Sequence, residues 1–323
     1  MKKITLAICA TLLTGLSLMG AMAAEFPEKP IRIIVPYAPG GGGDILARMY
    51  ADKLKTELGQ PVIIDNKPGA GTLIGSELVA KAQADGYTLL FTTNSVLIAP
   101  ILNAAAAKFD PIKDLTPVVP IGSIAMVLVA HPAVPANTSA ELVAYLKKNP
   151  GKVSFASSGT GGITHLAGEL FKTKAGVTMT HIPYKGAAPA LTDLMGGQVE
   201  LLFDAMITAN PHIKSGKLKA IGMANATRWE GSPDIPTLAE SGLPDFKMSG
   251  WYGVLAPAGT PAKVLERLNA ESNKIIKSPE FAAKLREGGL SPMGGDLEGY
   301  RKTVRDEFTT WQKVIKDGNI TID

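Results

Sequence analysis

The segment VPYAPGGGGDILAR, residues 35–48 of this 323-residue chain, carries the strongest local structural signal in the sequence. It continues a short β-branched run at residues 31–35, which is typical of a buried strand. It leads into apolar residues spaced four apart from Leu46 to Leu58, which is the spacing of a helix face, and Gly59 is placed as the helix stop. The sequence therefore predicts a strand, a glycine-rich turn and a helix in this order.

The four glycines of this turn can bring backbone amides close to an anion. The first N–H groups of a helix have no partner within the helix, and glycine lets the backbone approach a ligand. A phosphate-binding P-loop would place a lysine where this chain has Asp44, and a dinucleotide-binding turn would need glycine where Ile45 stands. We expect a carboxylate, which amides and hydroxyls alone can hold. The alternative is that the glycines only make a tight turn.

Strands and helices alternate along the rest of the chain. The expected strands are 31–35, 61–65, 87–92, 153–156, 177–182, 199–203, 217–223 and 251–256, and the expected helices are 43–58, 71–83, 139–148, 163–175, 187–195, 261–276, 279–287 and 297–316. This order predicts parallel sheets covered by helices. The apolar run 118–130 is long enough to serve two sheets, and residues 226–247 are expected to be mostly loop.

Three further turns are rich in glycine and small hydroxyl residues. They are Asn66–Thr72, Thr92–Ser95 and Ser157–Gly162, and each lies between an expected strand and the segment that follows it. In open α/β sheets, ligands bind at the carboxyl ends of the strands, where these turns lie. Four such turns in one chain favour a shared binding site over four unrelated tight turns.

The first 24 residues have the features of a secretory signal. Lys2 and Lys3 precede an apolar stretch at 4–19, and Ala21–Ala23 gives an A-x-A exit. A membrane anchor is the alternative, but the stretch is short and contains Thr, Gly and Ser. Cys9, the single cysteine, lies inside this segment, so the mature chain would have no thiol. We expect a bacterial periplasmic protein.

Composition limits the other partners. The full chain has 33 basic and 29 acidic residues, and removing the two signal lysines leaves 31 against 29, a net charge of about +2. No basic cluster with interleaved aromatic residues is present, so we expect no nucleic-acid partner. About 300 mature residues exceed the usual size of one hydrophobic core, which predicts two lobes.

The usual sequence signatures of enzymes are missing. The chain has no G-x-S-x-G nucleophile elbow and no H-E-x-x-H motif, and its four histidines do not have the spacing of metal ligands. We therefore expect no catalysis, no cofactor and no metal. The alternative is a secreted α/β enzyme that uses Asp44 and Asp204 as acid and base.

Several side chains near the expected site have two interpretations. Asp44 either stabilises its helix start and pairs with the arginine one turn later, or orders loop amides or a water in the pocket. Asp204 is a helix cap or a polar wall of a cleft. His165 either packs in the core or touches a ligand. Lys185 is expected to be solvated rather than ligand-binding, and Trp251 to belong to the hinge or core rather than the cleft.

Over nearly the whole mature length, the chain resembles the Bug-type substrate-binding proteins of tripartite tricarboxylate transporters. The segments that carry the resemblance are FPEKPIRIIVPYAPGGGGDILAR, LGQPVIIDNKPGAGTLIG, ADGYTLLFTTNS, SFASSGTGGITHLAGE, HIPYKGAAPALTDLMGGQVELLFD, IPTLAESGLP and WYGVLAPAGTP. Together and in this order they are specific. The chain departs from the usual PGG-x-x-D pattern only in having glycine at both variable positions, which could loosen that loop.

The resemblance implies an α/β fold of the two-lobed periplasmic-binding-protein kind, type II. Each lobe would be a mostly parallel sheet flanked by helices, with two interdomain crossovers. Residues 1–24 would be the signal peptide, 25–127 with 249–323 the first lobe, and 128–248 the second lobe.

The resemblance also implies a function and a set of ligand-binding residues. A small carboxylate (mono-, di- or tricarboxylate, or an amino or aromatic acid) would close the lobes, for uptake by membrane subunits of such a transporter. A ligand-presenting sensor partner is the alternative, and we expect a monomer. The implied binding residues are Tyr37, Ala38, Pro39, Gly40, Gly41 and Asp44 in the first loop, Ser157, Ser158, Gly159, Thr160 and Gly161 in its partner loop, and Thr93, Asn94 and Asp204 at the far end.

Overall fold

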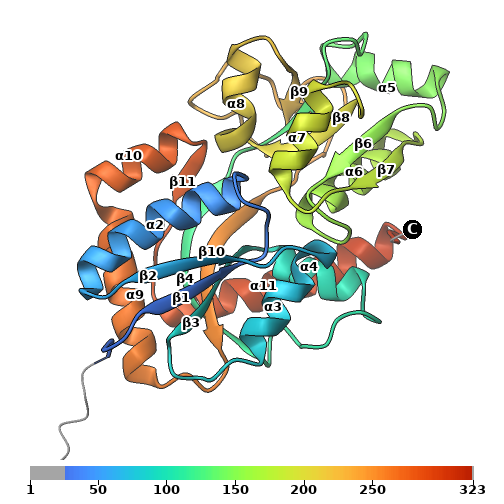
Figure 1. The fold of residues 1–323 in the computed structure, drawn as a ribbon. Coiled ribbons are helices and arrows are strands. Elements are labelled where there is room, and N and C mark those ends of the chain that lie inside the picture. The colour runs from blue at the N-terminus through green and yellow to red at the C-terminus, as the bar shows by residue number, and fades with distance from the viewer. Residues whose placement is uncertain (1–25, 322–323) are drawn as a thin grey trace, which may run out of the picture.

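The structure, a computed structural model, describes residues 26–321. This part of the chain forms two sheets, one of six and one of five strands, each with helices on its faces. Figure 1 shows the two sheets in separate lobes, with the blue and orange segments in one lobe and the green and yellow segments in the other. The chain ends therefore build one lobe and its middle builds the other, and the predicted fold class is confirmed.

The first lobe contains the glycine-rich turn. Its strands are β1 (Ile31–Val35), β2 (Val62–Asn66), β3 (Thr88–Thr93), β4 (Leu115–Ile124), β10 (Gly250–Pro257) and β11 (Leu290–Pro292), in the order β11-β4-β10-β3-β1-β2. Its helices are α2 (Gly42–Leu58), α3 (Leu73–Ala80), α4 (Ser95–Leu102), α9 (Ala262–Lys277), α10 (Pro279–Glu287) and α11 (Leu297–Asp317), with a 3-10 turn at Ala70–Thr72.

The second lobe repeats this plan. Its strands are β5 (Met126–Ala130), β6 (Ser154–Ser157), β7 (Thr180–Pro183), β8 (Leu201–Ala205) and β9 (Lys219–Met223), in the order β7-β6-β8-β5-β9. Its helices are α5 (Ser139–Lys148), α6 (Ile163–Ala175), α7 (Ala187–Met195) and α8 (Met206–Lys214).

Most strands of each sheet run in one direction. The neighbours β1, β2 and β3 are parallel, and β4 shares their direction because both β3 and β4 are antiparallel to β10. In the second sheet β6, β7 and β8 are parallel, while β5 is antiparallel to β8 and to β9. In both sheets the strand that enters directly from the other lobe is reversed, and in the first sheet the short edge strand β11 is also antiparallel to β4. The predicted parallel sheets are therefore each interrupted by a crossover strand.

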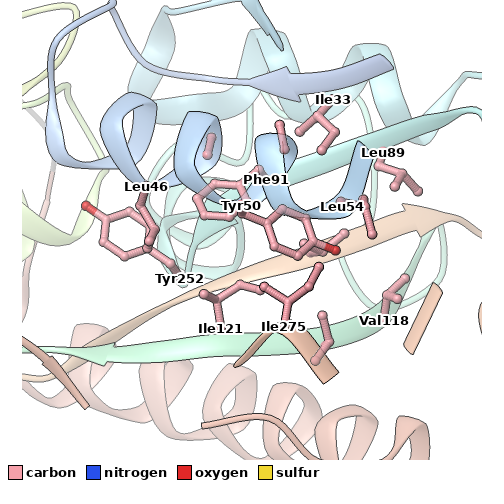
Figure 2. Close-up of a cluster of buried hydrophobic side chains, with 14 of the residues drawn as sticks. Ile33, Leu46, Tyr50, Leu54, Leu89, Phe91, Val118, Ile121, Tyr252 and Ile275 are labelled. Atoms are coloured by element: carbon pink, nitrogen blue, oxygen red, sulfur yellow. The ribbon is translucent and has the colours of Figure 1, made fainter. Parts of the chain in front are cut away.

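Helix α2 shows how the sequence pattern builds the first core. Leu46, Tyr50 and Leu54 are fully buried, and their four-residue spacing places them on one helix face. Figure 2 shows this face packed over Phe91 of β3 and Tyr252 of β10. The helix ends at Gly59, whose φ of 67° is left-handed and whose N–H bonds to the Lys55 carbonyl.

The chain crosses between the lobes at two points, between β4 and β5 and between β9 and β10. The side chain of Asn225 joins these two crossovers. Its Nδ2 donates to the carbonyl of Ile124 at 2.8 Å, and its Oδ1 accepts from the N–H of Met126 at 2.7 Å. These two hydrogen bonds hold the two connections beside each other.

The C-terminal helix α11 spans both lobes. Near its start, Tyr300 and Val304 pack in a cluster with first-lobe residues, whereas Ile315 at its end belongs to the hydrophobic core of the second lobe. Ile320 continues this contact beyond the helix. The last turn of α11 therefore ties the second lobe to the first, and in Figure 1 the C-terminus lies beside the second lobe.

Two helices were absent from the sequence prediction. They are α4 and α8, and each has a proline near its C-terminal end, Pro100 and Pro211. A proline in a helix interior removes one hydrogen bond and is normally a stop signal. These helices tolerate it because they are short and buried against the sheets, with Ile98 and Ala209 fully inaccessible.

Candidate functional site

A narrow pocket lies between the lobes, at the carboxyl ends of β1, β3, β6 and β8. It leaves about 40 Å³ for the centres of water molecules, so the lobes stand close together. The residues that line it are Tyr37, Gly41, Gly42, Gly43, Thr93, Ser95, Ile124, Met126, Ser158, Ile163, Thr164, Ala187, Asp204, Ala205 and Tyr252. Among these described residues the wall is mainly small, hydroxyl-bearing or apolar, and Asp204 is its one acidic side chain.

The start of helix α2 forms one wall of this pocket. Gly41 is the N-cap, so the N–H groups of Gly42 and Gly43 belong to the first helical turn and have no partner within the helix. A Cβ on Gly42 would lie 2.9 Å from the Tyr252 hydroxyl, and one on Gly43 would lie 2.6 Å from the Tyr37 ring. Both positions therefore need glycine, because the aromatic side chains pack directly against the helix start.

Asp44 holds the glycine-rich loop in shape. Its Oδ2 accepts the N–H of Gly40 at 2.9 Å, and its Oδ1 accepts Nδ2 of Asn66 at 2.9 Å. Arg48 donates Nε to Oδ2 at 3.0 Å. Burial works against the ionised form, but these hydrogen bonds outweigh it and keep the pKa of Asp44 below its usual value. Both interpretations of Asp44 thus hold together: it pairs with Arg48 and it orders a loop amide.

Hydroxyl groups connect the first loop to the end of β3. The Tyr37 hydroxyl lies 2.8 Å from Thr93 Oγ1 and accepts the Thr93 N–H at 3.2 Å. Thr93 Oγ1 in turn lies 2.9 Å from Ser95 Oγ. The Tyr37 hydroxyl therefore holds the turn that follows β3 in place, and Thr93 and Ser95 of this turn line the pocket.

The start of helix α6 forms the wall of the second lobe. Within the turn before it, the N–H of Gly159 donates to Ser157 Oγ at 3.2 Å and the N–H of Gly161 donates to His165 Nδ1 at 3.1 Å. These two amides are therefore used inside the turn. Ser158, Ile163 and Thr164 are the members of this segment that line the pocket.

A pair of stacked histidines supports this turn from behind. The rings of His165 and His181 are 3.9 Å apart, and His181 Nε2 lies 2.6 Å from Ser157 Oγ. Burial, reinforced by the neighbouring His165, lowers the pKa of His181 to about 3, so this ring is neutral near pH 7. His165 accepts the Gly161 N–H at Nδ1, which places its proton on Nε2, facing Glu169. His165 itself does not line the pocket.

The two lobes touch directly beside the pocket. The N–H of Ala38 donates to the carbonyl of Lys185 at 2.9 Å, and the N–H of Ile163 donates to Ser95 Oγ at 2.9 Å. Each bond joins one lobe to the other. The described arrangement is therefore a closed one, in which backbone groups of both lobes meet around the pocket.

Asp204 stands at the end of β8, on the second-lobe side of the pocket. Its side chain is 2 % exposed, and the Thr208 hydroxyl donates to its Oδ2 at 2.6 Å. Burial raises the pKa of Asp204 to about 7 against the lowering effect of hydrogen bonds from Thr208 and the Ala205 backbone. No lysine, arginine or histidine is among the described residues that line the pocket.

The structure places the predicted residues in and around this pocket, but only some of them line it. Those that line the pocket are Tyr37, Gly41, Thr93, Ser158 and Asp204. Those that lie behind or beside it are Ala38, Pro39, Gly40, Asp44, Asn94, Ser157, Gly159, Thr160 and Gly161. Lys185 contributes its backbone carbonyl to the lobe contact, and Trp251 is buried in the first lobe with its Nε1 bonded to Glu307.

Sequence analysis missed several pocket residues. Tyr252 lies on β10, more than two hundred residues after the glycine-rich turn, and its place beside Gly42 depends on the crossover that returns the chain to the first lobe. Ile124 and Met126 flank the other crossover. The WYG motif in β10 can be recognised in the sequence, but its position beside the glycine-rich turn follows only from the strand order. Within residues 26–321, no cluster of His, Cys, Asp or Glu is arranged to hold a metal ion, and no helix has the length and apolarity to cross a membrane.

Two lobes of this strand order, joined by two crossovers and enclosing a pocket at the strand ends, define a periplasmic-binding-protein architecture. The sequence matches the tripartite tricarboxylate transporter family receptor model over residues 46–320. The chain belongs to this family, and it is similar to members called Bug proteins. Protein BugT of Bordetella pertussis is 37% identical over 296 residues, covering 91% of each chain.

Solved structures give the same result. A protein of R. palustris solved with adipate is 34% identical, with a TM-score of 0.89 over 92% of this chain and 99% of that one. MatC of Rhodopseudomonas palustris, solved with bound malate, is 30% identical, with a TM-score of 0.86 over 90% of this chain and 100% of that one. The matched family is one of receptors, and a further solved structure, periplasmic binding protein BugD, is 34% identical with a TM-score of 0.88 over 92% of this chain and 99% of that one.

Proposed function

We propose that this protein captures a small carboxylate between its lobes by hinge closure. The observation that carries the proposal is the meeting of two helix starts, of α2 from the first lobe and α6 from the second, at one pocket that contains no basic side chain. Helix starts offer unpaired N–H groups and a partial positive charge to an anion. Adipate and malate in the two related structures support this class of ligand.

The hydroxyls around the pocket complete the site. Ser95, which accepts the Thr93 hydroxyl, and one of the two paired hydroxyls of Ser158 and Thr164 can donate to carboxylate oxygens. A low-charge anion needs no lysine when such donors join the helix-start amides around it. The hydrogen bonds of Ala38 with Lys185 and of Ser95 with Ile163 form only when the lobes approach. Ligand binding would therefore favour the closed state by adding contacts to both lobes at once.

The proposal also covers the segments that move, the signal peptide and the partner. The segments 25–127 with 249–323 and 128–248 would move as the two lobes, with Asn225 at the crossovers between them. The proposed signal peptide lies in residues 1–24, outside the described residues. The closed form, as a monomer, would deliver its ligand to membrane subunits of a tripartite tricarboxylate transporter, and we propose no enzymatic activity.

A thermal-shift screen tests this function. The mature protein is heated with mono-, di- and tricarboxylates and with amino acids, and the mixtures are analysed for products after incubation. We expect at least one carboxylate to raise Tm, since a ligand that binds the native state alone stabilises it, and to be recovered unchanged. A ligand that is converted would support the enzyme alternative, and a screen in which no carboxylate raises Tm would contradict the proposal.

A further inference from the structure

Asp204 is out of place in a site for anions. It is 2 % exposed and lines the pocket, and the lining residues within the described chain include no cation that could pair with it. Buried carboxylates without a cationic partner are costly, so a site for a negatively charged ligand would be expected to exclude one. If Asp204 takes part in binding, its role must allow a second carboxyl group, that of the ligand, in the same pocket.

Asp204 lines the pocket, and its carboxyl group accepts hydrogen bonds from its own lobe. The Thr208 hydroxyl donates to Oδ2, and the backbone of Ala205 supplies a further hydrogen bond. The titratable groups that face it from the first lobe are the phenols of Tyr37 and Tyr252. Strand β5 and helices α6, α7 and α8, which pack against β8, contribute no charged side chain to the pocket wall.

Asp44, the carboxyl group in the first turn of α2, is fully occupied. Arg48, Asn66 and the Gly40 N–H take up its oxygens behind the helix start. The start of α2 therefore offers hydrogen-bond donors to this small pocket, whereas an ionised Asp204 would offer only acceptors. Unpaired amides can hold an ionised carboxylate, whereas an acid can accept a second anionic group only if it carries a proton.

We propose that Asp204 takes part in binding as the protonated acid: it donates a hydrogen bond to an oxygen of the ligand's second polar end, and binding of such a ligand in alkaline solution takes up one proton from the solvent. This deepens the proposed function, on which it rests. The ligand class is a carboxylate with a second oxygen-bearing end, such as a dicarboxylate. The proton adds to a carboxylate oxygen of Asp204, and no other bond forms or breaks.

Burial already favours the neutral acid, because it raises the pKa of Asp204 to about 7 in the protein without ligand. A bound anion beside it would raise that pKa further. The affinity for a two-ended carboxylate should then be constant at low pH and fall about tenfold per pH unit well above pH 7, since one proton must be supplied for each ligand bound.

The test uses calorimetry on the mature wild-type protein with adipate, malate and whichever other carboxylate gives the largest thermal shift at pH 6. Titrations run from pH 5.5 to 9 in buffers of different ionisation enthalpy, which reports the number of protons exchanged. We expect about one proton taken up per ligand at pH 8.5 and close to none at pH 5.5. Asp204→Asn, whose amide is a permanent donor, should bind with an affinity that no longer depends on pH over this range.

The controls separate the outcomes. Asp193→Asn, on α7, removes a carboxyl that accepts the Tyr184 hydroxyl away from the pocket, and it should keep the wild-type pH dependence. A wild-type affinity that does not change from pH 5.5 to 9 would overturn the inference, as would an amino-acid ligand whose binding needs the ionised Asp204 and is lost in Asp204→Asn. If that variant does not fold, the proton count for the wild type still decides. Failure of every carboxylate to bind at pH 6 would instead reject the proposed function.

Discussion

Gly71 of the first lobe meets Thr160 of the second so closely that a Cβ on Gly71 would lie 2.0 Å from the Thr160 carbonyl oxygen. No side chain fits between these two backbones. The contact lies at the turn of residues 157–162 and joins the two lobes. Gly71 is therefore a residue through which closure can be altered without changing the pocket wall.

Substituting Gly71→Ala should hold the lobes apart. We expect ligand affinity to fall at least about tenfold, which corresponds to a loss of about 1.4 kcal/mol, while the pocket residues remain unchanged. Small-angle scattering with ligand should show a larger radius of gyration than the wild type. Gly59→Ala is the matched control, because Gly59 has a similar left-handed φ of 67° but nothing within 4 Å of its Cβ position. Equal affinities in Gly71→Ala and the wild type would show that this contact does not limit closure.

The charge at the start of α2 should decide whether an anion binds. Gly41 has an extended φ of −81°, and its Cβ position is 3.6 Å or more from other atoms, so a side chain fits there. Gly41→Asp should abolish the carboxylate-induced rise in Tm by placing a negative charge at the pocket. Gly41→Asn, of the same size but neutral, should retain more of it. Similar ligand-induced shifts in both variants would count against an anion site at this helix start.

His165 should act as a positioning residue for the second-lobe turn. Replacement by leucine leaves the buried Gly161 N–H without an acceptor, which costs about 1–3 kcal/mol. We expect His165→Leu to lower both the free energy of unfolding in urea and the ligand affinity. His165→Asn keeps an acceptor at the δ position and should recover part of the affinity. If the two variants bind alike, the hydrogen bond to Gly161 does not orient the site.

His181 should make the protein less stable in acid. Its pKa is about 3 in the folded protein and about 6.5 in the unfolded chain, so between these values the unfolded chain binds the extra proton. Stability should fall as the pH drops from about 6.5 towards 3. Urea unfolding of His181→Gln should show a shallower decrease across this window. A variant whose profile follows the wild type would exclude His181 as the cause.

Asp204 should have the opposite effect on stability. Its folded pKa of about 7 exceeds the value of about 3.9 expected in the unfolded chain, so the folded protein holds the proton between them. Without ligand, stability from this group should fall as the pH rises from about 4 to 7. The difference in unfolding free energy between Asp204→Asn and the wild type should therefore be more favourable to the variant at pH 8 than at pH 5. An unchanged difference between the two pH values would indicate that Asp204 is ionised throughout.

The repeated strand–turn–helix units were predictable because their signals are local. The buried row on α2 and the stop at Gly59 follow from spacing and backbone preference alone. Helices α4 and α8 were not predictable in the same way, because Pro100 and Pro211 carry a stop signal that tertiary burial overrides.

The pocket was only partly predictable for a related reason. Glycine-rich turns at strand ends indicate where a site lies, and the family resemblance selects Tyr37, Gly41 and Ser158 within those turns. Tyr252 and Ile163 enter the site through the crossover and the contact between lobes, which no short-range pattern encodes. The N–H groups of Gly159 and Gly161 bond to the side chains of Ser157 and His165, and these contacts likewise could not be predicted from the glycine-rich pattern.

The decisive experiment is a crystal structure of the mature protein with the carboxylate that gives the largest thermal shift. We expect closed lobes, with one carboxylate group within hydrogen-bonding distance of the amides at the start of α2 and of Ser158, in the turn before α6, or Thr164, in the first turn of α6. A carboxylate bound outside this pocket, or held by one lobe alone, would contradict it.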